Sequence, residues 1–135
     1  MHIEPTVFSE QLKGTLGELL GIRFVETSPD HVVAELTCRE ALTTLGGSLH
    51  GGTLMALADT VGAAATLLNL PPGVAGTTTI ESKTNFFAAG RSGTVRAEAT
   101  PLHRGRRTHV WQTRVTDADG RLLSLTIQTQ MVLTR

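Results

Sequence analysis

Apolar residues near the start of the chain recur at the spacing of an α-helix. In residues 7–20 the positions Phe8, Leu12 and Leu16 lie four apart, which places them on one face of a helix. Gly21 follows this stretch, and glycine commonly ends a helix because it readily adopts the left-handed backbone conformation. The pattern therefore predicts one short amphipathic helix over Val7–Leu20.

A second and longer helix is predicted from Leu54 to Leu70. The stretch is almost wholly apolar and rich in alanine, so a helix formed from it has little polar surface and is expected to be buried. It does not have the pattern of a membrane span, because Asp59 interrupts the apolar run and Pro71-Pro72 end it.

Six further segments have the alternation or the β-branched composition that is typical of strands. They are Ile22–Thr27, His31–Thr37, Thr77–Phe87, Gly93–Leu102, Thr108–Asp117 and the residues from Leu123 to the C-terminus. The turn residues Ser28-Pro29-Asp30 predict a hairpin between the first two strands, and the last three strands are expected to form an antiparallel meander with one solvated face. The order of elements predicts an α+β fold, one central long helix packed on a curved antiparallel sheet, with residues 1–135 as a single domain.

The composition argues against some classes of binding partner and favours one cellular compartment. Twelve Lys and Arg balance twelve Asp and Glu and only 4% of residues are aromatic, which argues against nucleic-acid binding. The single cysteine, Cys38, excludes a disulfide framework and a zinc site of paired thiolates, and the histidines lack metal-ligand spacing, so we expect no metal. No signal peptide is visible, because His2, Glu4 and Pro5 stand where an apolar core would lie, so a cytoplasmic protein is expected.

Asp59 is the first candidate for chemistry. Between Gly51 and Ile80 it is the only residue with an ionisable side chain. An unpaired carboxylate is costly to bury, so a carboxylate in this helix needs dedicated hydrogen-bond donors or must be neutralised. A carboxylate held in an apolar cleft is a common general base or nucleophile. The alternative is that Asp59 lies on the solvated side of the helix or caps a neighbouring element, and the residues alone leave both open.

His50-Gly51-Gly52 stands immediately before the long helix. The backbone N–H groups of the two glycines are expected to be unpaired within the helix and aligned with the positive end of its dipole. Glycine also lets a ligand oxygen approach the backbone, so this end of the helix could polarise a carbonyl or hold an oxyanion. The alternative is that the glycines only make a tight entry into the helix.

The spacing of these two candidates suggests a site that one subunit does not complete. Asp59 lies nine residues after His50 and eight after Gly51, so it is about 12 Å from Gly51 along a helix axis at 1.5 Å per residue. That distance is too long for Asp59 to contact a group bound on the Gly51 amide. A substrate carbonyl could instead be reached by Asp59 from one subunit and by Gly51 from another.

A basic loop is the third candidate. Arg104, Arg106 and Arg107 fall within residues 103–109, at the junction of two predicted strands. Arginines next to a glycine can hold phosphate groups, and in a neutral chain a local basic patch suits a small phosphorylated ligand. A solvated hairpin turn is the alternative. Cys38 has no local base motif, and we expect an inert thiol there.

Three segments together carry a family resemblance. LHGGTLMALADTVGAA, TTTIESKTNFFAAGRSG and HRGRRTHV resemble the hotdog-fold acyl-CoA thioesterases, in particular the phenylacetic-acid-degradation-type and 4-hydroxybenzoyl-CoA-type enzymes with an HGG-x6-Asp/Glu motif. The resemblance runs from about Leu16 to the C-terminus. It implies a hotdog fold and hydrolysis of an acyl-CoA thioester with an aromatic or medium-chain acyl group. It also implies a homodimer or homotetramer with sites at the subunit interface, and no cofactor, since coenzyme A is part of the substrate.

The resemblance assigns roles to individual residues. The acidic residue on the helix is nucleophile or general base in that family, which falls on Asp59. The first glycine of the motif gives its backbone N–H to the thioester carbonyl, which falls on Gly51, and His50 helps to position the ligand. A hydroxyl residue on the strand after the helix orients water, and Thr79 or Thr77 is the candidate.

The same resemblance implies a ligand for the basic loop. It also shows one position at which this chain differs from many members of the family. In the family this loop contacts the nucleotide part of coenzyme A, which falls on Arg104, Arg106 and Arg107. Many members have Asn or Gln six residues before the histidine, where this chain has Thr44. A shorter hydroxyl side chain there affects how the acidic residue or the water is held.

Two other functions on the same fold remain open. The chain could bind acyl-CoA without catalysis, although such proteins usually add a DNA-binding domain and the residues before Gly21 are few. It could dehydrate a 3-hydroxyacyl thioester, but that reaction typically needs a paired histidine and acid, and His50 belongs to the glycine motif. The acyl pocket is expected to be lined by small residues such as Ala56, Gly62 and Ala63, which do not choose between an aromatic and a medium-chain group.

Overall fold

The computed structural model describes residues 2–134. Its six strands form one sheet in which every neighbouring pair is antiparallel, in the order β1-β2-β4-β5-β6-β3. The strands are β1 (Arg23–Ser28), β2 (His31–Thr37), β3 (Gly76–Phe86), β4 (Thr94–Arg104), β5 (Thr108–Thr116) and β6 (Leu122–Leu133). The predicted hairpin of β1 and β2 and the predicted meander of β4, β5 and β6 are both confirmed.

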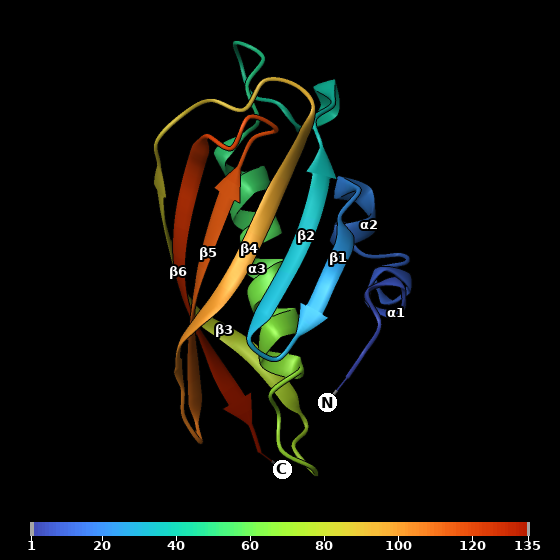
Figure 1. The fold of residues 1–135 in the computed structure, drawn as a ribbon, viewed down its shortest axis with the longest axis vertical. Coiled ribbons are helices and arrows are strands. Elements are labelled where there is room, and N and C mark those ends of the chain that lie inside the picture. The colour runs from blue at the N-terminus through green and yellow to red at the C-terminus, as the bar shows by residue number, and fades with distance from the viewer. Residues whose placement is uncertain (1, 135) are drawn as a thin grey trace.

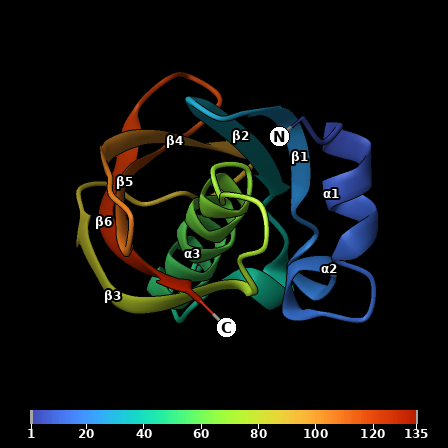
Figure 2. The same ribbon diagram turned by 90° about the horizontal axis from the view of Figure 1, so that it is seen from below.

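One long helix, α3 (Gly51–Leu67), lies in the hollow of the curved sheet (Figures 1 and 2). Its inner face is mostly apolar and packs into the core, with Leu57, Val61 and Ala65 all at 0% exposure. Burial of such a stripe is what holds a helix on a sheet, because each large apolar side chain contributes about 1.5–3 kcal/mol when removed from water. The fully buried Trp111 of β5 also joins the sheet to α3, because its Nε1 donates a hydrogen bond to the hydroxyl of Thr66 at 2.9 Å.

The first predicted helix is two helices in the structure. They are α1 (Pro5–Gln11) and α2 (Leu16–Leu20), and the prediction of one continuous helix is wrong. The break is at Gly14, whose φ of 77° lies in the left-handed region that no residue of a right-handed helix adopts. Phe8 on α1 is buried and its ring lies 5.2 Å from that of Phe24, so α1 packs beside β1 (Figure 2).

The sheet has two edges, and β3 forms one of them. β3 pairs with β6 on one side only, so its other side presents unpaired backbone groups. It also presents large apolar side chains, because Ile80 is 55% exposed and Phe86 is 50% exposed, and Phe87 follows at 58%. An edge strand of this kind is suited to pairing with another chain. A short 3-10 turn, η1 (Glu40–Leu42), lies between β2 and α3.

The outer face of the sheet carries an ion cluster centred on His31. Its Nδ1 lies 3.0 Å from Glu26 and its Nε2 lies 3.1 Å from Glu98, and Glu98 also accepts from Arg96 at 2.7 Å. The hydrogen bond to Glu26 is the largest of the effects that raise the pKa of His31 above its ordinary value. The Arg96 guanidinium holds the pKa of Glu98 below its usual range.

We expect His31 to make stability depend on pH. A histidine whose pKa is raised in the folded state stabilises the fold fully below its unfolded pKa of about 6.5, and that contribution is lost as pH rises through the folded pKa. His31→Gln should therefore be less stable than the natural protein at pH 5.5, and the difference should shrink by pH 8.5. Urea unfolding at both pH values measures this, with the exposed His103→Gln as control. A difference that is equal at both pH values would contradict the assignment.

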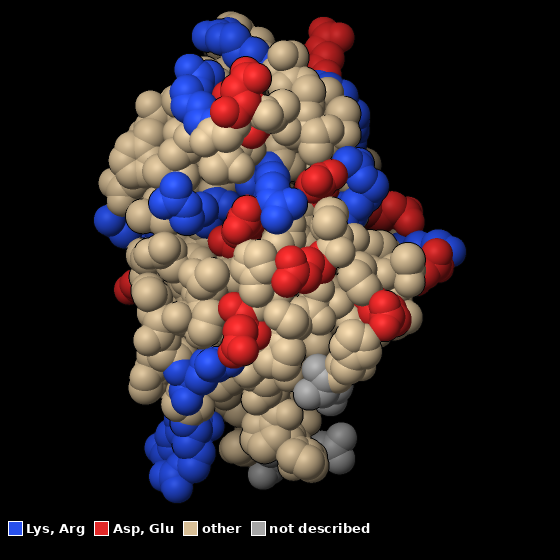
Figure 3. Space-filling model, in the orientation of Figure 1, with Lys and Arg blue, Asp and Glu red and all other residues tan. Residues whose placement is uncertain are grey.

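Within residues 2–134 no helix combines the length and the apolarity that crossing a membrane requires. Acidic and basic side chains are intermixed over the upper and middle parts of the face seen in Figure 3, and basic side chains gather at its lower end.

Candidate active site

His50 is the N-cap of α3. Its backbone is extended, with φ −60° and ψ 137°, and its Nδ1 accepts a hydrogen bond from the backbone N–H of Gly52 at 2.7 Å. Because Nδ1 is the acceptor, a neutral His50 ring carries its proton on Nε2. The helix therefore begins at Gly51, three residues before the predicted start at Leu54. A capping histidine and two glycines are sufficient to begin it without an apolar residue.

Only one of the two glycine amides is free. Neither glycine N–H donates to a carbonyl oxygen of the helix, as predicted, but the N–H of Gly52 is taken by the side chain of His50. Thr53 and Leu54 donate to the carbonyl oxygen of His50, at 2.9 Å and 3.3 Å. Among the described residues, nothing accepts a hydrogen bond from the Gly51 N–H. The cap thus leaves one amide at the positive end of the helix dipole.

Asp59 lies two turns further along α3 and is held through one carboxylate oxygen. Its Oδ1 accepts from the hydroxyl of Thr79 on β3 at 2.7 Å and from Nε2 of Gln128 on β6. Oδ2 has no hydrogen-bond partner among residues 2–134. Of the two threonines that the sequence offers, Thr79 therefore meets Asp59. Thr77 bonds instead to Gln130 and to the carbonyl oxygen of Met131, both at 2.9 Å.

The residues that support Asp59 form a buried polar row on β6. Gln128 and Gln130 are both at 0% exposure, and Nε2 of Gln130 donates to the hydroxyl of Thr79. The sequence pattern does not predict a role for these glutamines, because the polar positions of an alternating strand are expected on the solvated face. In the structure they face inward, and the apolar Leu125 and Ile127, which precede them on the strand, lie on the opposite face and are partly exposed. The sequence did hold one indication of this arrangement. Gln128 and Gln130 lie two residues apart in a predicted strand, so their side chains lie on the same face, and Asp59 is an acid that needs donors.

Gly62 makes room for this row. A Cβ at position 62 would lie 2.0 Å from Oε1 of Gln128, far inside contact distance. Gly62 therefore faces Gln128 and not an acyl pocket, so the expectation that it lines the pocket is wrong. Ala56 packs against the apolar core.

A cavity of about 290 Å³ opens beside Asp59. Asp59, Thr60, Ala63, Ala64 and Leu67 of α3 form one wall. Phe8 and Gln11 of α1, Leu12 at the end of α1 and Phe24 of β1 form the other. Of the three small residues that were predicted to line a pocket, Ala63 does so. The cavity is thus largely apolar and has one acid in its wall.

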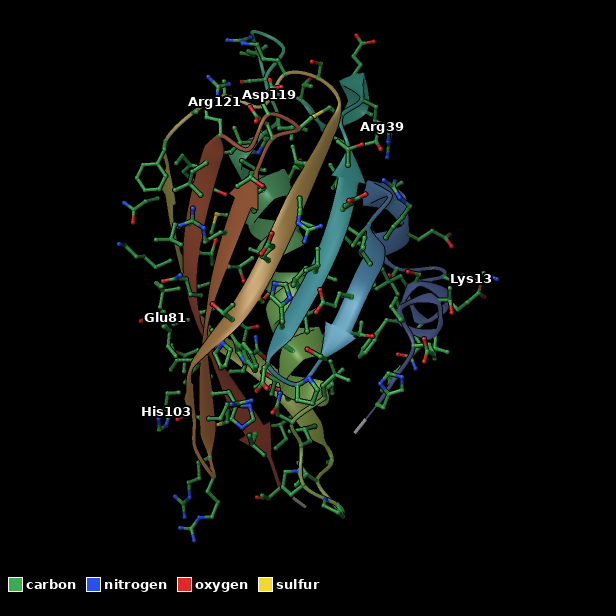
Figure 4. All side chains as sticks on the ribbon, in the orientation of Figure 1. Lys13, Arg39, Glu81, His103, Asp119 and Arg121 are labelled. Atoms are coloured by element: carbon green, nitrogen blue, oxygen red, sulfur yellow. The ribbon has the colours of Figure 1, made fainter. Side chains whose placement is uncertain are left out.

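The three arginines do not behave alike. The side chain of Arg104 is held by two other segments. Its Nη1 donates to Asp30, in the turn between β1 and β2, at 2.6 Å and to Asn69, just after α3, at 3.3 Å. Arg106 and Arg107 lie exposed in the hairpin between β4 and β5, and their side chains have no polar partner among the described residues. Basic side chains project from the lower end of the molecule in Figure 3, and Figure 4 shows His103 at the same end of β4. Arg106 and Arg107 are therefore the two that are available to a ligand.

The other candidates lie apart from Asp59. Thr44 is in the exposed loop before α3, where its backbone bonds to Ser48 and Gly47, and its side chain does not reach Asp59 within this chain. Burial raises the pKa of the Cys38 thiol, which keeps it protonated. No group of three or more His, Cys, Asp or Glu in the described part of the chain could hold a metal ion.

Comparison with known proteins places this geometry in a family. The sequence profile of the thioesterase superfamily matches residues 46–124, which include the glycine motif and Asp59. The chain is 33% identical to the 1,4-dihydroxy-2-naphthoyl-CoA hydrolase of Escherichia coli K12, over 82% of this chain and 80% of the relative. It is 36% identical to the proofreading thioesterase EntH of Cronobacter turicensis, over 80% of this chain and 78% of the relative.

Solved structures agree on the fold. A glutamine-to-alanine variant of the thioesterase PA1618 from Pseudomonas aeruginosa matches with a TM-score of 0.94 and 29% identity, over 98% of this chain and 96% of that chain. The Escherichia coli PaaI protein has the same fold, with a TM-score of 0.83 and 22% identity over 93% and 88% of the two chains. The predicted α+β hotdog architecture is confirmed. The chain belongs to the thioesterase superfamily and is a hotdog-fold thioester hydrolase.

Proposed function

We propose that this protein hydrolyses an acyl-CoA thioester, with an aromatic or medium-chain acyl group, to the free acid and coenzyme A in the cytoplasm. The observation that carries the proposal is the state of Asp59. One carboxylate oxygen is fixed by Thr79 and Gln128, the other has no partner in residues 2–134, and the residue lies in the wall of an apolar cavity. A carboxylate that is oriented and still able to react is what a nucleophile or general base requires.

The proposed chemistry needs no cofactor, since coenzyme A is part of the substrate. Oδ2 of Asp59 attacks the thioester carbonyl carbon, or removes a proton from a water molecule that attacks it. The carbonyl oxygen becomes an oxyanion, which a free backbone N–H such as that of Gly51 stabilises. The C–S bond then breaks, and coenzyme A leaves as a thiolate that takes up a proton. In the first route, water hydrolyses the resulting anhydride and restores Asp59.

The two groups that this chemistry needs are too far apart in one chain. Gly51 and Asp59 are separated by eight residues of helix, about 12 Å. We infer a homodimer or homotetramer in which Gly51 of one subunit and Asp59 of another act on the same carbonyl. The unpaired outer edge of β3, with its exposed Ile80 and Phe86, supports pairing through this strand. The ring of Phe86 also lies close to Gly51: a Cβ added at position 51 would be 3.1 Å from the Phe86 ring.

The name of one relative supports coenzyme A as the leaving group and an aromatic acyl group, and the name of the other supports thioester hydrolysis. One relative is a naphthoyl-CoA hydrolase and another a proofreading thioesterase. The experiment that tests the proposal is a screen of aryl- and alkanoyl-CoA substrates with detection of released thiol. Release of thiol from at least one of them at a rate that depends on enzyme concentration supports it. Tight binding without thiol release would favour the non-catalytic alternative, and formation of an enoyl thioester would favour a dehydratase.

We expect Arg106 and Arg107 to bind the phosphates of coenzyme A. Their joint replacement by alanine should raise KM for an acyl-CoA about tenfold and leave kcat within about twofold, because each lost charge-assisted contact is worth about 1 kcal/mol or less at an exposed position. The same acyl group on N-acetylcysteamine, which has no phosphate, should show no change. Steady-state kinetics on both substrates measure this, with the exposed Arg114→Ala as control. An equal KM increase on both substrates would contradict the assignment.

A further inference from the structure

The cavity beside Asp59 continues into a second one. The second has a volume of about 310 Å³ and shares Phe8, Gln11 and Leu67 with the first. Beyond these shared walls it is lined by Ile3, by Leu70 and by residues 71–76, which connect α3 to β3. The two cavities therefore lie end to end between α1 and α3. We call them together the α1–α3 groove.

The groove runs along α3 away from His50. Asp59, Ala63 and Leu67 lie four residues apart and so form one line on the helix surface. From Asp59 to Leu67 the axis advances about 12 Å at 1.5 Å per residue. The second cavity extends the groove past the last turn of the helix. Its shape is thus long and narrow, with the acid near one end.

The side chains that line the groove beyond Asp59 are almost all apolar. Asp59 is the only charged residue among those that line either cavity. The hydroxyl of Thr60 already donates to the carbonyl oxygen of Ala56 at 2.7 Å. Gln11 is exposed at the margin. A ring hydroxyl inside this groove would lose its hydrogen bonds to water without replacement, which costs about 1–3 kcal/mol.

We propose that the α1–α3 groove binds the hydrocarbon tail of a straight-chain alkanoyl group of about 10 to 14 carbons, with the thioester at Asp59. The inference rests on the proposed function and chooses within it a linear alkanoyl chain over an aromatic ring. The length follows from the groove. An extended chain advances about 1.2 Å per bond, taken from 3.3–3.6 Å for the three backbone bonds of a residue, so 12 Å holds about ten bonds. The second cavity takes the remaining carbons.

The first test is a series of alkanoyl-CoA substrates from butanoyl to hexadecanoyl, with benzoyl-CoA alongside. Burial of each methylene contributes enough to raise kcat/KM about two- to fourfold per carbon until the groove is full. The value should rise to a maximum between 10 and 14 carbons, and decanoyl-CoA should exceed benzoyl-CoA by more than tenfold. Hydrolysis that favours benzoyl-CoA, or that is independent of chain length, overturns the inference and leaves the proposed function standing.

The second test moves the end of the groove. Ala63→Phe fills it one turn from Asp59, so the decanoyl-to-butanoyl ratio of kcat/KM should fall at least tenfold. Leu67→Trp fills it two turns away and should lower the tetradecanoyl-to-octanoyl ratio by a similar factor. Leu19→Trp is the matched control, because Leu19 is 67% exposed on α2 and lines neither cavity.

Circular dichroism and thermal melting establish that each variant is folded, and every ratio is measured within one variant, so a loss of active protein does not change it. Equal losses at all chain lengths in both variants overturn the groove as the acyl site. If no acyl-CoA of any length is hydrolysed by the natural protein, the proposed function itself fails and the inference fails with it.

Discussion

Replacement of Asp59 by asparagine is expected to lower kcat for thioester hydrolysis by about 10³-fold, because it removes the only carboxylate that lies in the cavity wall. The amide keeps the size of the side chain, and its oxygen can still accept from Thr79 and Gln128, so the fold and the groove should be preserved. Substrate binding should survive the change. Single-turnover kinetics and calorimetric titration with the best acyl-CoA separate the two effects.

The control for this variant is Glu81→Gln, which neutralises an exposed carboxylate on the same strand as Thr79. It should retain at least half of the natural turnover. Turnover of Asp59→Asn within tenfold of the natural protein would show that another group carries the reaction. A single turnover in water enriched in heavy oxygen tests for the nucleophilic route. Label in the aspartate shows that the carboxylate itself attacked the carbonyl and that water then attacked the aspartyl carbon of the anhydride, whereas label in the product acid alone is compatible with both routes.

Gly51→Pro should remove the oxyanion donor while keeping the helix. Proline has no N–H, and the first position of a helix tolerates it because that N–H has no partner within the helix. His50 before it has the extended backbone that a residue preceding proline requires. Loss of one oxyanion donor typically costs 10²–10³ in kcat, so we expect a decrease of about that size with little change in melting temperature.

Gly51→Ala is the matched control for the proline variant. It adds a Cβ at the same place, 3.1 Å from the half-exposed ring of Phe86, but keeps the N–H. Its kcat should therefore stay within about tenfold of the natural value. If the alanine and proline variants lose the same activity, the loss is steric and the amide has no role.

The same two variants test whether a site is shared between subunits. A hybrid of one Gly51→Pro subunit and one Asp59→Asn subunit has two different sites. If each site takes Gly51 from one chain and Asp59 from the other, one site of the hybrid has both natural groups and the other has neither. Co-expression should then recover activity that neither variant has alone. Lack of recovery in a purified hybrid would place both groups of a site in one chain.

The sequence predicted the site residues that differ chemically from their neighbours in the chain. It did not predict the residues that hold them in place by hydrogen bonds. Asp59 stands alone among apolar residues, and the glycine motif precedes a helix, so both were visible without the structure. Gln128 was missed because a polar residue in an alternating strand is normally assigned to the solvated face, whereas here the polar face is buried beneath α3. The packing of α3 on β6 brings that face to Asp59, and local sequence patterns do not report this packing.

The same limit explains the errors in the fold. The apolar periodicity of residues 7–20 is matched only in part, because Phe8 is buried and Leu12 packs against the core but Leu16 is 60% exposed. Periodicity does not report the backbone of Gly14, whose positive φ divides the segment into two helices. Arg104 was grouped with its neighbours by sequence, but its partner Asp30 lies in the turn between β1 and β2. Long-range contacts of this kind depend on sheet order, which local patterns do not determine.

The contact between Gly62 and Gln128 restricts how this sequence can change. Because a methyl group at position 62 would occupy the place of the Gln128 carboxamide, a larger residue at 62 requires a smaller one at 128. That exchange removes a donor from Asp59. Substitutions at positions 62 and 128 are therefore coupled. A larger side chain at position 62 can be accommodated only in variants that hold the Asp59 carboxylate less firmly. Directed evolution of the acyl groove is better aimed at Ala63 and Leu67, whose side chains do not contribute to holding the acid.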